Sequence, residues 1–332
     1  MMAYNTELYR EIDRIYEQRR EENMCDLERR KQAVFARIPK LEGIDDEIKS
    51  LGLKLYKIAL NNADVKEEVA KLRSKQKELL ELKKALLQEN GYNEDELSER
   101  FHCSICRDYG VVDGKTCECY KKLLTEKAYE LSNLSAQLTH QSFDTFDLSL
   151  YSEDVDDYYG VSPKEHMQRI VNDCKEFIKD FETTDKNLLF WGEPGLGKTF
   201  LSTCIAKELI ETNHSVIYET AYKTFSMLEE LKFKKTDNED KLRFKVEKLY
   251  SCDLLILDDL GSEFATQYTT AALFDIINSR LISGKKTVIN TNLTVDELSG
   301  KYGERVFSRM LGSYKMLEFI GKDIRSIKSV NN

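Results

Sequence analysis

The sequence has few of the features that mark membrane-spanning or secreted proteins. Its 332 residues include only three prolines and one tryptophan, whereas 33% of them are charged. No apolar run approaches the roughly 20 residues that cross a bilayer, and the N-terminus lacks the apolar core of a signal peptide. We therefore expect a cytoplasmic protein with long solvated helices, divided into two or three domains.

Basic residues are fewer than acidic ones. The chain has 50 Lys and Arg against 59 Asp and Glu, which gives a net charge of −9. This balance argues against a protein that coats nucleic acid, so any contact with DNA must be local. The eight cysteines come without a signal peptide, and we therefore interpret them as thiols or metal ligands rather than disulfides.

The clearest motif that is present is a phosphate-binding loop at residues 187–200, NLLFWGEPGLGKTF. Its pattern is G-x-x-x-x-G-K-[ST], in which glycines let backbone N–H groups point at phosphates. The lysine would reach the β- and γ-phosphates, and the threonine hydroxyl would hold Mg²⁺. A chance glycine-rich turn is the alternative, but an apolar run before the loop and helical spacing after it favour an ATP site. The predicted binding residues are Gly192, Glu193, Pro194, Gly195, Leu196, Gly197, Lys198, Thr199 and Phe200.

Two further polar groups follow apolar strands. The run that begins at Asp253 is expected to form a strand that ends in Asp258 and Asp259, the Walker B arrangement. Asp258 would complete the Mg²⁺ shell, and Asp259 would orient or deprotonate the attacking water. Residues 287–291 are expected to form another buried strand, after which Asn292 could hold that water.

Two arginines lie one helical turn apart in the segment GERVFSRM. Arg305 and Arg309 are either ordinary surface residues or an arginine finger, which supplies positive charge to the γ-phosphate bound by a neighbouring subunit.

Four cysteines are clustered in the segment FHCSICRDYGVVDGKTCECYKK. Cys103 and Cys106 form a C-x-x-C pair, and Cys117 with Cys119 forms a second, closer pair. This spacing predicts a closed, structural Cys₄ zinc site, with His102 as a possible substitute ligand. A redox-active C-x-x-C pair is the alternative. The other cysteines are interpreted as buried thiols, namely Cys25, Cys174, Cys204 and Cys252.

Helical patterns precede this segment, at residues 6–36, at residues 44–60 and from Asp64 to residue 90. They predict a helical hairpin or short coiled coil. An intramolecular bundle and a docking surface for a partner protein remain open.

A basic and aromatic stretch lies within the predicted helical segment 222–249. It holds lysines and arginine around two phenylalanines, a combination that can pair phosphates and stack bases of single-stranded DNA. A solvated helical face is the alternative. The residues concerned are Lys232, Phe233, Lys234, Lys235, Lys241, Arg243, Phe244 and Lys245.

The order of these motifs resembles the AAA+ ATPases of the bacterial DnaC/DnaI helicase-loader family, with the IstB transposition helpers as close kin. The resemblance covers about residues 143–325 and includes FDTF, GEPGLGKT, LLILDDLG, TNL and GERVFSRM. It implies an α/β P-loop fold with a parallel central sheet and no C-terminal lid domain. It also implies that Asn292 is sensor 1, that Arg309 or Arg305 is the finger, and that Arg325 is a sensor 2-like arginine.

The zinc unit resembles DnaI-type more than DnaC-type loaders. By this resemblance, we expect an ATP-dependent loader of the hexameric replicative helicase onto single-stranded DNA, acting as a homo-oligomer with ATP, Mg²⁺ and Zn²⁺. Asp259 stands where many relatives have Glu, so ATP hydrolysis should be slow. The alternatives are an IstB-like transposition helper and an adaptor that ATP locks without hydrolysis.

The expected domains follow from these assignments. Residues 1–98 form a helical, partner-binding region and residues 99–125 the zinc unit. Residues 126–157 form a linker, and residues 158–332 form the ATPase domain.

Overall fold

The structure is a computed structural model, and the parts of the chain that it describes are residues 2–60, 66–134, 140–233 and 239–325. Asp64, Lys234 and Lys235, which the sequence analysis singled out, lie outside these ranges. No helix in the described part of the chain is both long and apolar enough to cross a membrane. The chain divides into two compact units, one of residues 11–120 and one of residues 1–10 with residues 121–332.

The larger unit is built on a five-stranded sheet in the order β4-β5-β6-β3-β7, in which every neighbouring pair is parallel. Its strands are β3 (Asn187–Gly192), β4 (Val216–Thr220), β5 (Leu254–Leu260), β6 (Lys286–Thr291) and β7 (Tyr314–Phe319). Since all strands run the same way, their carboxyl ends share one edge of the sheet, and ligands of such sheets bind there.

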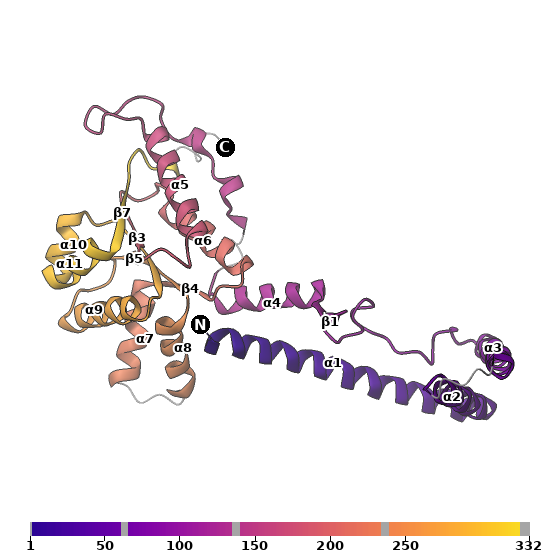
Figure 1. The fold of residues 1–332 in the computed structure, drawn as a ribbon. Helices are drawn as coiled ribbons and strands as arrows, with labels where there is room; N and C mark the ends of the chain where they lie inside the picture. The colour runs from indigo at the N-terminus through magenta and orange to yellow at the C-terminus, as the bar shows by residue number, and fades with distance from the viewer. Residues whose placement is uncertain (1, 61–65, 135–139, 234–238, 326–332) are drawn as a thin grey trace. The chain divides into compact units, whose positions relative to one another are not determined.

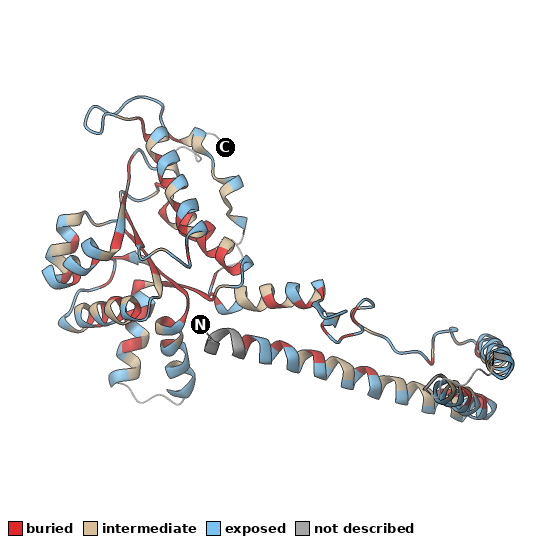
Figure 2. Cartoon of the chain, in the orientation of Figure 1, coloured by how far each residue is buried: buried red, intermediate tan, exposed pale blue. Residues whose placement is uncertain are grey.

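Both faces of this sheet are buried, which explains why its strands are continuous apolar runs. Along β3, Leu188 and Phe190 join one core cluster, whereas Leu189 between them joins the other. Ile256 and Leu257 of β5 divide between the two clusters in the same way. Figure 2 shows buried residues along the strands and on the helix faces that cover them.

Helices cover the two faces as layers. α5 (Pro163–Lys179) and α6 (Lys198–Glu211) supply the first core cluster. The second comes from five other helices, which Figure 1 shows on the opposite side of the sheet. They are α7 (Ala221–Phe233), α8 (Glu239–Ser251), α9 (Gln267–Ile282), α10 (Val295–Tyr302) and α11 (Glu304–Ser313).

The segment before α5 contains α4 (Glu118–Leu131) and the short 3₁₀ helices η2 (Phe143–Thr145) and η3 (Leu148–Leu150). Phe146 and the neighbouring leucines pack against the first core cluster. The stretch that the sequence analysis assigns to a linker therefore contributes to the core of the larger unit.

The sequence patterns predicted β6, and the apolar run that forms β3, at close to their observed positions. The strand β7 was missed, because its burial pattern alternates with exposed Lys315 and does not form an apolar run. The structure also extends β5 to Leu260, beyond the predicted end of that strand at the two aspartates. After β7, the described residues 320–325 add no helical domain.

The smaller unit is helical with a short hairpin. Its elements are α1 (Met2–Arg37, which begins in the other unit), α2 (Pro39–Leu60), α3 (Lys66–Glu89), β1 (Val111–Val112) and β2 (Lys115–Thr116). α2 and α3 pack on each other, and Val34, Leu41 and Leu87 form part of a buried cluster between the helices. Leu53 and Tyr56 are each more than 60% exposed, so α2 keeps apolar surface outside this bundle.

Candidate functional site

The phosphate loop joins the end of β3 to the start of α6, and its backbone requires glycine. Gly192 and Gly195 have φ values of 131° and 79°. A Cβ atom at Gly192 would lie 2.3 Å from the carbonyl oxygen of Phe319, and one at Gly195 would lie 1.8 Å from Asp323 Oδ1. The two glycines therefore let β7 and the segment after it approach the loop closely.

Lys198 is the buried cation of the site. Its Nζ donates hydrogen bonds of 2.7 Å to the carbonyl oxygens of Gly192 and Glu193. Burial lowers the pKa of Lys198 to about 8, against the opposing effect of Asp258 and other nearby carboxylates. An ammonium group held in this way is stabilised by an incoming anion.

Asp258 is oriented by three side chains from different elements. Thr199 Oγ1 donates to Asp258 Oδ2 at 3.2 Å, and the hydroxyl of Tyr218 donates to the same oxygen. Asn290 Nδ2 donates to Asp258 Oδ1 at 2.7 Å and to Ser202 Oγ at 2.9 Å. Thr199 and Asp258 thus offer two oxygen ligands side by side, the chemistry that Mg²⁺ prefers.

Sequence reasoning missed Tyr218 and Asn290. Each follows an apolar pair in its strand, Tyr218 after Val216 and Ile217 in β4 and Asn290 after Val288 and Ile289 in β6. That contrast with their strand neighbours was the available signal.

Asp259 is set apart from Asp258 by a distortion of β5. The pairing of β5 with β6 shifts register between Leu257 and Leu260, and Asp259 has a φ of 58°. Asn292 Nδ2 donates to Asp259 Oδ1 at 3.3 Å. An exposed carboxylate in a left-handed conformation next to an amide fits the predicted pairing of a water-activating group with sensor 1.

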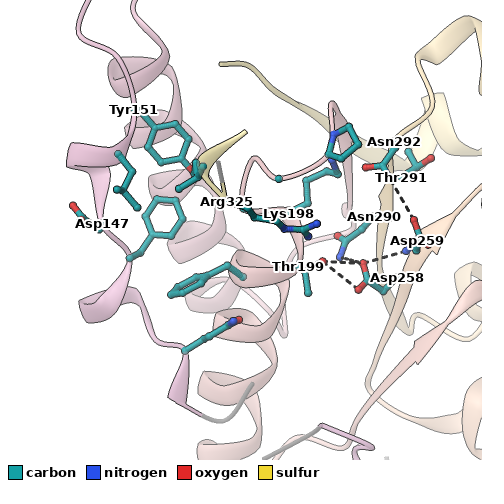
Figure 3. A pocket seen from close by; sticks show the side chains of 18 of the residues that line it. Asp147, Tyr151, Lys198, Thr199, Asp258, Asp259, Asn290, Thr291, Asn292 and Arg325 are labelled. Atoms are coloured by element: carbon teal, nitrogen blue, oxygen red, sulfur yellow. Dashed lines mark hydrogen bonds between the residues drawn. The ribbon is translucent and has the colours of Figure 1, made fainter. Parts of the chain in front are cut away.

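One cavity of about 740 Å³ at the carboxyl edge of the sheet is lined by residues that include Lys198, Thr199, Asp258, Asp259, Asn290 and Asn292. Figure 3 shows Tyr151 across this pocket from Asp258, with Lys198 between them. The predicted residues that line it are Pro194, Gly195, Gly197, Lys198, Thr199, Phe200, Asp258, Asp259, Asn292 and Arg325. Gly192, Glu193 and Leu196 line an adjoining cavity.

The end of the cavity opposite the carboxylates is aromatic. The Phe146 ring lies 5.4 Å from the ring of Phe200 in an edge-to-face arrangement and 5.9 Å from that of Tyr151. The buried Tyr151 hydroxyl donates to the Leu196 carbonyl at 2.9 Å, which fixes the phosphate loop from behind. Of these rings, sequence reasoning assigned only Phe200 to the site; it noted the FDTF motif but gave Phe146 and Tyr151 no role there. The further lining residues that it missed are Gln141, Thr145, Phe146, Asp147, Leu150, Tyr151, Thr220, Asn290, Thr291 and Ile324.

The predicted finger arginines do not line this cavity. Both are exposed on α11. The guanidinium of Arg305 lies 4.2 Å from the ring centre of Phe274, a cation–π contact within the same chain. Arg309 has no such ring contact within the described part of the chain, so the two arginines are not equivalent.

The four cysteines converge as the zinc prediction requires. Their Sγ atoms all lie within 4.8 Å of one another. The distance is 3.9 Å between the Sγ atoms of Cys103 and Cys117, and 3.4 Å between those of Cys106 and Cys119. Tetrahedral zinc with Zn–S bonds of about 2.3 Å places sulfurs about 3.8 Å apart. The donor set therefore fits a closed zinc site, and His102 is not part of it.

Neighbouring groups hold the cysteine cluster in place. The carboxylate of Asp108, which is fully buried, accepts hydrogen bonds of 2.9 Å from the backbone N–H groups of His102 and Cys103. The hydroxyl of Tyr16 donates to Cys119 Sγ at 3.1 Å. Such contacts orient metal ligands, and the one from Tyr16 ties α1 to the cluster.

The remaining cysteines follow the sequence analysis with one exception. Cys174, Cys204 and Cys252 are buried, as predicted. Cys25 is exposed, so its prediction as a buried thiol is wrong. The cause is that α1 presents this position to solvent, between Met24 and Asp26.

The described part of the basic stretch lies on α7 and α8. The Lys232 ammonium lies 5.0 Å from the ring centre of Tyr268, and that of Lys248 lies 4.5 Å from that of Phe244. Phe233 is 63% exposed and Phe244 is 40% exposed, so these rings are not packed wholly inward. A groove of about 710 Å³ beside them is lined by Phe244, Met227 and four lysines, and also by three acidic residues. The lysines are Lys223, Lys241, Lys245 and Lys248, and the acidic residues are Glu130, Glu219 and Asp240.

Comparison with known proteins gives a family match and several relatives. Residues 138–313, more than half of the chain, match the family described as IstB-like ATP binding protein. The replicative helicase loader DnaC of Escherichia coli (strain K12) is 26% identical over 146 residues, which are 44% of this chain and 58% of that protein. DnaC of Buchnera aphidicola subsp. Baizongia pistaciae (strain Bp) is 29% identical over 162 residues, or 48% and 65% of the two chains. This chain thus spans less than two thirds of these curated relatives.

Among solved structures, a crystal structure of the DnaC helicase loader aligns with 55% of this chain and 99% of its own, at 22% identity and a TM-score of 0.45. The family match bears out the resemblance predicted from the motifs. Together with the parallel sheet and the phosphate loop at the end of β3, it confirms the predicted α/β P-loop fold of AAA+ type.

The lowered pKa of Lys198 predicts proton uptake when ATP binds. With a pKa of about 8, about half of the Lys198 side chains should be neutral at pH 8 in the free protein. A bound triphosphate favours the ammonium form, so binding should take up about 0.5 proton per ATP at pH 8 and almost none from Lys198 at pH 6.5. Affinity should fall as the pH rises through 8, by up to about ten-fold per pH unit.

Calorimetry of ATP binding in two buffers of different ionisation enthalpy measures this uptake. If ATP binds at pH 8 with the same heat in both buffers, no net proton is taken up. That result would contradict the lowered pKa assigned to Lys198.

The cysteine cluster predicts about one zinc per chain, because closed Cys₄ sites couple metal binding to folding. Cys106→Ser or strong chelation should remove the metal and the order of residues 103–119, whereas the exposed Cys25→Ser should retain both. Metal analysis and thiol titration of protein purified without chelator measure this. Zinc-free protein with four freely reactive thiols would refute the site.

Proposed function

The chain belongs to the family of IstB-like ATP-binding proteins, and from this premise we propose that it is an ATP-dependent loader of the replicative DNA helicase. The observation that carries the proposal is the single cavity in which Lys198, Thr199, Asp258, Asp259 and Asn292 meet. The helicase as target comes from the curated relatives, which are named replicative helicase loaders.

In this proposal the cavity binds and hydrolyses ATP. Lys198 neutralises phosphate charge, and Thr199 with Asp258 holds Mg²⁺, which supplies further positive charge to the phosphates when bound. Asp259 accepts a proton from the attacking water, and Asn292 positions that water. Arg325, at the rim of the cavity, contacts the phosphates as a sensor 2-like residue.

Hydrolysis is slow in this proposal. Asp259 has a shorter side chain than the glutamate of many relatives, and its hydrogen bond to Asn292 is long at 3.3 Å. The binding of ATP, rather than its rapid hydrolysis, then controls whether the chain contacts helicase and DNA.

The assignment of regions completes the proposal for this cytoplasmic protein. Residues 1–98 contact the helicase, and residues 99–125 form a zinc unit that fixes α1. Residues 126–157 connect the zinc unit to the ATPase domain and add residues 141–151 to its nucleotide cavity, and residues 158–332 form the rest of that domain. ATP-bound chains assemble so that each site is completed by a neighbour.

The loader role predicts an ATP-dependent complex with helicase. The purified replicative helicase of the same organism should bind the chain and load onto circular single-stranded DNA with ATP and Mg²⁺. Lys198→Ala should reduce loading at least about ten-fold, because the lysine serves phosphate charge rather than the core. The measurement is the amount of helicase retained on DNA circles.

Two outcomes would contradict this proposal, and each would favour a different function. Binding to a transposase and to duplex DNA, with no helicase loading, would favour an IstB-like transposition helper. Loading that requires ATP but shows no turnover would identify an adaptor that ATP locks without hydrolysis.

We assign the finger role to Arg309, because Arg305 is engaged with Phe274 in its own chain. Arg309→Ala should lower ATP hydrolysis and ATP-dependent assembly while leaving ATP binding intact, and Arg305→Ala serves as the matched control. Mixing Arg309→Ala chains with Asp259→Asn chains should restore part of the activity, since mixed interfaces contain one complete site. Loss of ATP affinity in dilute, monomeric Arg309→Ala would contradict the assignment.

Single-stranded DNA binds, in this proposal, along the groove between α7 and α8. Phe244 stacks on bases, and Lys241 and Lys245 pair with phosphates. Lys241→Glu with Lys245→Glu should weaken binding strongly and lower the slope of affinity against salt by roughly 0.7 for each phosphate that is no longer neutralised. Lys179→Glu, exposed on α5, is the control. Titration of a labelled oligonucleotide across a salt series tests this, and unchanged affinity would exclude the groove.

A further inference from the structure

The cavity contains polar atoms that the phosphate chemistry does not use. Gln141 lines the same cavity as Lys198 and Asp258. Its Oε1 is shielded from solvent and has no hydrogen-bond partner among the described residues. An unpaired buried acceptor is costly, and such an atom in a cavity wall indicates a ligand that donates to it.

The position of Gln141 within the cavity points to the base of the nucleotide. Phe146 and Phe200 line the same cavity, and their rings lie 5.4 Å apart, edge to face. Gln141 comes two residues before η2, which leads directly to Phe146. Aromatic rings offer stacking surface to a purine, whereas the charged end with Lys198 and Asp258 suits phosphates.

The chemistry of an amide side chain distinguishes the two purines. A glutamine pairs with adenine in two places, since Oε1 accepts from the N6 amino group and Nε2 donates to N7. Guanine presents acceptors at both O6 and N7, so Oε1 would remain unpaired and would face another oxygen. The last torsion of glutamine is broad, so the amide plane can turn to present Oε1 to the base.

We propose that Gln141 is a specificity-determining residue that selects adenine over guanine by hydrogen bonds to N6 and N7. This inference rests on the nucleotide site proposed above and adds the choice of base to it. Lys198 and the phosphate loop bind any nucleoside triphosphate, and Gln141 supplies the preference for ATP.

The test compares the affinities of ATP and GTP, with Mg²⁺, for three forms of the chain. The unchanged protein should prefer ATP by about ten-fold or more. Gln141→Ala should bring the ratio close to one, mainly by weakening ATP, and Gln141→Arg should favour GTP, because arginine donates to both O6 and N7. Gln168→Ala, which removes an exposed glutamine on α5 that donates to Asn172, should leave the ratio unchanged.

A second test changes the nucleotide and can be made on the unchanged protein. 7-Deaza-ATP lacks the N7 acceptor, and inosine triphosphate lacks the N6 donor. Both should bind the unchanged protein several-fold more weakly than ATP. Gln141→Ala should bind ATP, 7-deaza-ATP and inosine triphosphate with similar affinities. The difference between the two proteins then measures the interaction of Gln141 with the base.

The outcomes separate this inference from the nucleotide site on which it rests. ATP binding with an ATP:GTP ratio that is the same in the unchanged protein and in folded Gln141→Ala would overturn the role of Gln141 alone. Equal affinities of the unchanged protein for ATP, 7-deaza-ATP and inosine triphosphate would do the same. Binding of no nucleotide at all would instead overturn the proposed ATP site.

Discussion

The structure depends on a buried positive charge at the carboxyl edge of a parallel sheet. Lys198 donates to the carbonyl oxygens of Gly192 and Glu193, and burial has already lowered its pKa to about 8. A desolvated ammonium group gains most from an anion, because Coulomb attraction is strong where water is excluded. Gly192 and Gly195 let Phe319 and Asp323 approach this loop closely. Phosphate binding is therefore a consequence of how the sheet is packed.

The strand β5, which carries Asp258 and Asp259, is linked to the helix α11, which carries Arg305 and Arg309. After β5, Glu263 accepts hydrogen bonds from the Tyr302 hydroxyl and from the backbone N–H of Gly261. Lys301 donates to the carbonyl oxygens of Gly261 and Glu263. These contacts fix the loop that follows the two aspartates to α10, which leads into α11. The position of the arginines is thereby tied to the strand that carries Asp258 and Asp259.

Residues whose role lies in a local pattern could be predicted from the sequence. The phosphate loop, the aspartate pair and the four cysteines each occupy a short stretch of the chain, and their spacing is enough to recognise them. Asn290 and Tyr218 were missed because their contacts with Asp258 form only when strands far apart in the sequence become neighbours. Gln141 and Tyr151 lie in an irregular segment whose packing no periodicity describes. The order of the strands and the existence of β7 depend likewise on long-range pairing.

The central claim is that one cavity, lined by segments from across the larger unit, binds ATP. Hydrogen–deuterium exchange with and without ATP and Mg²⁺ tests it most directly, because it reports each segment separately. The account predicts slower exchange in residues 192–200, 143–151, 258–260 and 290–293 together, with little change in the helices α9 and α5 away from the cavity. Protection confined to the phosphate loop, or absent from all four segments at saturating ATP, would contradict it.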